Sequence, residues 1–137
     1  MPRQRDFNPS ILVSYALPCV ALPFSRGFKG SGWQLVVFLP RRLILEEEQL
    51  EICTAHDERM LWEMLLDHFG GCTIDQALVR GGGLREGVAE VNLHKKFLVL
   101  ATHSVETRRY FEALRRELEQ CSGESQILIT RQAIEIL

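Results

Sequence analysis

The sequence lacks the features that mark several large classes of protein. Its formal net charge is only −2, so no overall field draws it toward nucleic acid or an anionic membrane. Its four cysteines show none of the compact spacing that staples small secreted domains, which predicts reduced thiols in a cytoplasmic protein. No internal repeat and no low-complexity tract is present. The remaining expectation is an ordinary globular domain.

A long uninterrupted apolar run is also missing. The longest run, residues 11–24, is too short to span a bilayer, and Pro18 and Pro23 break it. Basic residues precede it, as in a signal peptide, but the two prolines argue against export. We expect residues 1–32 to form an apolar arm or edge strand followed by a loop, and residues 33–137 to form one domain.

The periodicity of the remaining sequence predicts alternating strands and helices. Strands are expected at residues 33–39, where Pro40 ends the strand, and at 73–80, 88–101 and 126–130. Helices are expected at about 55–69 and from the N-cap Ser104 to Gly123. A capping box of Thr54 and Asp57 begins the first helix, and Gly81-Gly82-Gly83 is expected to be a hairpin turn.

This order of elements predicts an α+β fold of the ferredoxin-like type. Its β-α-β-β-α-β sheet would carry two helices on one face, with the N-terminal arm added. The other face of the sheet would then be free. Because an uncovered apolar face seldom stays in water, we expect the protein to associate with itself as a homodimer, or with another protein.

The second half of the chain carries a layout that occurs elsewhere. It consists of the turn Phe69-Gly70-Gly71-Cys72-Thr73, glycines before Glu90, and a last helix leading into residues 123–129. From Trp62 onward this layout resembles small bacterial ferredoxin-like α+β proteins of unknown function. Leu84 departs from it, since an aromatic residue is expected after the glycines. The resemblance implies the fold and carries no assigned chemistry.

The strongest catalytic candidates are Glu90, Asn92 and His94. Residues two apart on a strand point to the same face, so a carboxylate, an amide and an imidazole would stand in one row. Such a row can hold a general base with its orienting partner, or bind a polar ligand. It is more typical, however, of the solvent-facing half of a long hairpin, where alternating polar residues are normal.

Three further residues are candidates for ligand binding. Arg85 is expected near the end of the hairpin, beside the row. His103 and Ser104 precede the last helix, where the helix start attracts phosphate or carboxylate groups. The alternative is that His103 and Ser104 simply end a strand and cap the helix.

The residue types for a zinc site occur within a short stretch: Cys53, His56, His68 and Cys72. A straight helix over residues 55–69 would separate the two histidines by about 18 Å, which is too far for one tetrahedral ion. We therefore expect no metal and no cofactor.

Nucleic-acid binding is a further alternative, through four arginines that repeat along the last helix: Arg108, Arg109, Arg115 and Arg116. Interleaved glutamates cancel most of their field, which favours a solvated helix face.

The sequence contains neither a P-loop ending nor a nucleophile elbow. It therefore favours a non-catalytic association or regulatory domain, in which the apolar arm packs across the partner. A small enzyme or ligand-binding protein is the alternative.

Overall fold

The computed structural model describes residues 3–15, 30–46, 48–124 and 126–137. Two long strands, β1 (Gly30–Leu45) and β5 (Val88–Ala101), pair antiparallel at the centre of a six-stranded sheet. On its other edge β1 pairs with β2 (Glu48–Glu51) and β6 (Ile129–Ile136). On its other edge β5 pairs with β3 (Thr73–Ile74) and β4 (Val79–Arg85).

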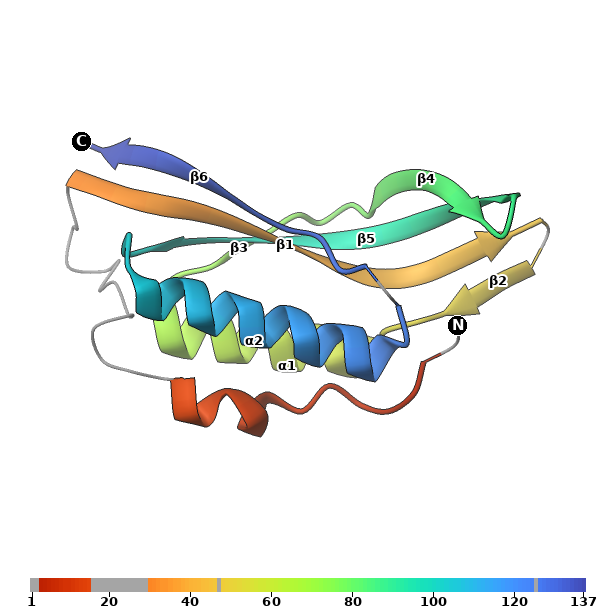
Figure 1. Ribbon diagram of the computed structural model, residues 1–137, viewed down its shortest axis with the longest axis horizontal. Coiled ribbons are helices and arrows are strands. Elements are labelled where there is room, and N and C mark those ends of the chain that lie inside the picture. The colour runs from red at the N-terminus through yellow and green to blue at the C-terminus, as the bar shows by residue number, and fades with distance from the viewer. Residues whose placement is uncertain (1–2, 16–29, 47, 125) are drawn as a thin grey trace.

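The predicted ferredoxin-like β-α-β-β-α-β arrangement is wrong. The sheet is curled and entirely antiparallel, and the order of strands and α-helices is β-β-α-β-β-β-α-β (Figure 1). Two strands are additional. β2 turns back against the end of β1 after Glu46, at a φ of 59°, and the strand predicted at residues 73–80 is divided into β3 and β4. β2 was not predicted, because all four of its residues are exposed and lack an apolar alternation.

Both helices lie on one face of the sheet (Figure 1). The helix α1 (Ala55–Phe69) begins at the predicted capping box of Thr54 and Asp57 and ends at Gly70. The helix α2 (Val105–Ser122) begins at the predicted N-cap Ser104. Both predicted helix starts are confirmed. They could be predicted because caps and a 3.6-residue period are local signals in the sequence.

The core lies between the helices and the sheet. One face of β1 and β5 contributes alternating buried residues: Trp33, Leu35, Val37, Leu39, Phe97, Val99 and Ala101. Helix residues such as Leu61, Leu65 and Leu114 cover them from the other side and are fully buried. The opposite face of the sheet carries no helix in the described part of the chain.

The prediction that Pro40 ends the first strand is wrong. Pro40 lies at a β-bulge, where the register between β1 and β5 shifts between Pro40 and Arg42. A bulge leaves one residue of the ladder unpaired, so a proline without an N–H is tolerated there. The strand therefore continues to Leu45.

The prediction that Gly81-Gly82-Gly83 forms the hairpin turn is also wrong. Gly81, Gly82 and Gly83 lie within β4, paired with residues of β5. The turn is formed by Glu86 and Gly87, both with positive φ, at 52° and 79°.

The N-terminal segment was predicted to be an apolar arm or an edge strand, and in residues 9–15 it is not a strand. Pro9–Tyr15 form a short 3₁₀ helix, η1, which lies on the side of the helices away from the sheet (Figure 1). Phe7 and Leu12 are buried against this chain's own helices. The rest of the predicted arm, residues 16–24, lies outside the described residues.

Candidate functional site

Two adjoining hollows lie along the glycine-rich strand β4. The first, of about 560 Å³, is lined by Phe38, His94 and the segment 126–128, with Val79, Gly81 and Gly82 of β4. The second, of about 380 Å³, contains Arg85, Glu90, Asn92 and Glu124. Gly82 and Gln126 line both, so the hollows adjoin, and we name them together the β4 trough. The glycines form a wall without side chains.

Arg85 organises the polar end of the β4 trough. Its Nε donates to Glu90 Oε2 at 2.6 Å, and its Nη2 donates to Glu124 Oε2 at 2.9 Å. Hydrogen bonds to these two carboxylates raise the pKa of the Arg85 guanidinium. The side chain thereby links the β4–β5 hairpin to the segment that follows α2.

The predicted row of Glu90, Asn92 and His94 is present on β5. Glu90 Oε1 accepts a long hydrogen bond of 3.5 Å from Asn92 Nδ2, so both of its oxygens have partners. Glu90 therefore anchors Arg85, and a catalytic role for the row stays a prediction. His94 lines the adjoining hollow, and burial lowers its pKa, which favours the neutral ring.

Glu124 is the residue of this site that sequence reasoning missed. Its Oε1 atom is buried and meets no hydrogen-bond donor among the described residues. A buried acceptor without a donor is unfavourable, so this atom offers a binding point to a ligand that carries an N–H or O–H. Glu124 follows a helix end in the sequence, where a carboxylate is unremarkable, and no local signal indicates its contact with Arg85.

His103 and Ser104 lie elsewhere, at a groove between α2 and β6. They line one end of this groove, together with Trp33, Arg108 and Arg131. The rings of Trp33 and His103 are 4.6 Å apart between centroids. The Ser104 hydroxyl accepts from the Thr107 N–H at 3.1 Å, so its role in the structure is that of the helix cap. Arg85 and His103 therefore belong to different sites.

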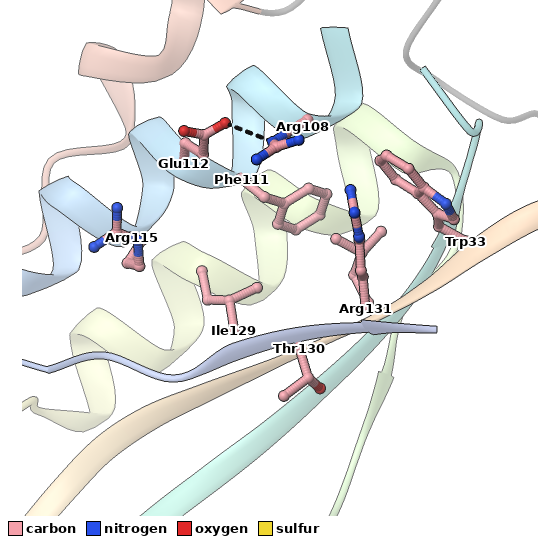
Figure 2. Close-up of a pocket in the computed structure, with 9 residues that line it drawn as sticks. Trp33, Arg108, Phe111, Glu112, Arg115, Ile129, Thr130 and Arg131 are labelled. Carbon is pink, nitrogen blue, oxygen red and sulfur yellow. Dashed lines mark hydrogen bonds and ion pairs between the residues drawn. The ribbon is translucent and has the colours of Figure 1, made fainter. Parts of the chain in front are cut away.

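The floor of the groove is apolar and its rim is basic (Figure 2). Trp33, Phe111 and Ile129 form the floor, and Figure 2 shows Arg131 standing beside Trp33. The Arg131 guanidinium carbon lies 4.4 Å from the centroid of the Trp33 ring, a cation–π contact. The sequence pattern missed this pair because the two residues meet only through the pairing of β6 with β1.

The four arginines predicted to bind nucleic acid do not form one free basic stripe. Arg108 and Arg115 both line the groove, but each pairs with a glutamate one turn later, Glu112 and Glu119, at 3.2 Å. Arg109 and Arg116 line a separate hollow beside Tyr15. Nucleic-acid binding stays a prediction.

The candidate metal ligands are dispersed. Cys53 is buried, and a hydrogen bond with Cys121, together with burial, raises the pKa of its thiol. His56 and His68 lie near opposite ends of α1. Burial raises the pKa of Cys72 to about 11. Among the described residues, no three histidine, cysteine, aspartate or glutamate side chains are grouped closely enough to hold a metal ion.

Comparison with known proteins adds no relative. No protein-family model, no curated protein and no solved structure matches this chain. The resemblance to small bacterial proteins of unknown function therefore stays a prediction. Within the described residues, no helix is both long and apolar enough to cross a membrane.

Proposed function

We propose that the protein functions by association, as a homodimer or as a subunit of a complex, and that the strand β6 is its contact element. The observation that carries the proposal is the free edge of this strand. β6 pairs with β1 along one edge, and none of the described strands pairs with its other edge. An unpaired strand edge presents backbone donors and acceptors that another chain can bind.

Three features that commonly keep such edges apart, namely proline, lysine and a β-bulge, are missing from β6, although it carries the charged residues Arg131 and Glu135. The segment contains neither proline nor lysine, and its pairing with β1 from Ile129 to Ile136 has no register shift. Eight residues make it longer than a typical short protected edge. Ile134 and Ile136 are only partly buried in the single chain, and an added strand would cover more of each side chain.

The surface beside this edge also favours association. Val36, Leu98 and Leu100 are half-buried and lie on the sheet face away from the helices, by strand alternation. Ile134 and Ile136 point to the same face at the edge of β6, beside Gly32 and Gly30 of β1, and the polar residues Gln34 and Gln132 lie between them and Leu100.

The mass of the native protein tests this proposal. Sedimentation equilibrium should give a multiple of 15.7 kDa, or show a partner when the protein is purified from its source. A single-chain mass at every concentration, with no partner retained, would contradict it.

A second candidate function is the binding of a small polar ligand in the β4 trough, favoured by the buried, unpartnered Oε1 of Glu124. Two carboxylates face one guanidinium there, so the site has an excess of acceptors and fits a compact cation or amide. Methylammonium chloride should shift the NMR signals of residues near Glu124 and Arg85, and E124Q should abolish the shift. Equal shifts with sodium chloride would contradict specific binding.

A further inference from the structure

We propose that the partner of β6 is the β6 strand of a second copy of this chain, paired antiparallel about Ala133. This inference rests on the proposed function and adds the identity of the partner and the register. It depends on two charged residues of β6, Arg131 and Glu135, which form no ion pair with any described residue.

Arg131 and Glu135 lie on the same face of the sheet. Arg131 is paired with Leu35, whose side chain is buried under the helices, and Glu135 is four residues further along the strand. Side chains at even spacing on a strand point to one side, so both charges stand on the helix side of the edge. Both residues are exposed.

Two-fold symmetry limits the registers that are available. Directly opposed residues in an antiparallel pair point to the same face, so a symmetric pairing must be centred on a residue. Centring on Ala133 places Arg131 of each copy opposite Glu135 of the other, and the symmetry gives this contact twice. Centring on Gln132 would place Arg131 opposite Ala133, and centring on Ile134 would place it opposite Leu137.

The register about Ala133 also gives compatible side-chain pairs on the face of the strand away from the helices. Ile134 would lie opposite Gln132, and Ile136 opposite Thr130, with no like charges opposed. Residues 130–136 of each copy would be paired along their whole length. The two sheets would then continue into each other, with all helices on the same side.

Reciprocal charge reversal tests the register. R131E places two glutamates opposite each other at both contacts, and E135R does the same with two arginines. Each variant alone should therefore dimerise about tenfold or more weakly than the wild type. An equimolar mixture of R131E and E135R restores opposite charges at both contacts, so native mass spectrometry should show the mixed dimer in excess of either homodimer.

The double variant R131E/E135R should recover the wild-type dissociation constant. R80E reverses an exposed charge on β4 and is the matched control, expected to dimerise normally. Circular dichroism establishes that each variant is folded. If the wild type is a dimer but R131E and E135R dimerise as well as R80E does, the register is wrong while association stands. If the wild type is a monomer without a partner, both the register and the proposed function fail.

Discussion

Arg5 and Glu117 are 112 residues apart in the sequence, yet their side chains meet in two hydrogen bonds of 2.6 Å each. Glu117 also accepts from the backbone N–H of Asn8 at 2.9 Å. Asp57 of α1 acts in a parallel way, accepting from the Phe7 N–H at 2.9 Å and pairing with Arg3. One buried carboxylate from each helix therefore holds the N-terminal segment in place.

Removing Arg5 should detach this segment in part. R5A leaves Glu117, which is 2% exposed, without its charged partner. We expect a loss of about 1–2 kcal/mol in the free energy of unfolding, moderated by the partial exposure of Arg5. Urea unfolding measures it. R108A, which removes an exposed pair, should change stability by no more than about 0.5 kcal/mol. Equal effects of the two variants would contradict the anchoring role.

The burial of η1 predicts a contrast between neighbouring residues. Leu12 is 2% exposed and Val13 is 69% exposed. L12A should lower the free energy of unfolding by about 2–4 kcal/mol, because it opens a cavity against the helices. V13A should change it by less than about 0.5 kcal/mol. If both substitutions are neutral in thermal and urea unfolding, the 3₁₀ helix is not packed as described.

The β4–β5 hairpin predicts a contrast between two glycines. Gly87 has a φ of 79°, which other residues adopt with strain, so G87A should destabilise the protein by about 1 kcal/mol. A Cβ at Gly83 would meet no atom within 4 Å, so G83A should be neutral or slightly stabilising. If thermal unfolding shows that G83A destabilises the protein more than G87A does, the turn lies at the glycines 81–83 and not at Gly87.

His68 predicts a pH dependence of stability. Burial lowers the pKa of its ring below 6.5, and the ring stacks on Tyr110 with centroids 4.6 Å apart. As the pH falls through about 6.5, the unfolded chain binds a proton that the folded chain resists, so stability should decrease. His94 contributes with the same sign.

H68F keeps an aromatic ring and removes the titration. Its free energy of unfolding should therefore fall less than that of the wild type between about pH 7 and 5. Urea unfolding at several pH values measures both slopes. A slope in H68F equal to or steeper than that of the wild type would show that His68 does not carry this effect.

The helices were predictable because their signals are local. Thr54 and Asp57 mark the start of α1 within one turn, and Gly70 and Gly123 take the left-handed conformation at the helix ends. The strand β5 was predictable for a similar reason, since its apolar second half is continuous. Pro40 and the glycines of β4 were misjudged, because their usual local meaning is overridden by a bulge and by pairing with β5.

The candidate sites were only partly predictable, because they depend on contacts between distant segments. Glu90, Asn92 and His94 do line the β4 trough, as their spacing on one strand indicated. Glu124 and Arg131 had no such signal. Arg131 reaches Trp33 only because β6 returns beside β1, and Glu124 reaches Arg85 only because the chain crosses toward the hairpin after α2.

Hydrogen–deuterium exchange of the β6 amides tests the central claim most directly. In a single chain, the backbone N–H groups that point away from β1 have no strand partner among the described residues and should exchange quickly. Pairing of β6 with a second copy predicts that these amides, within residues 130–136, become protected as the protein concentration rises, and that R131E abolishes this protection. Fast exchange at alternate residues of β6 at every concentration would contradict the pairing.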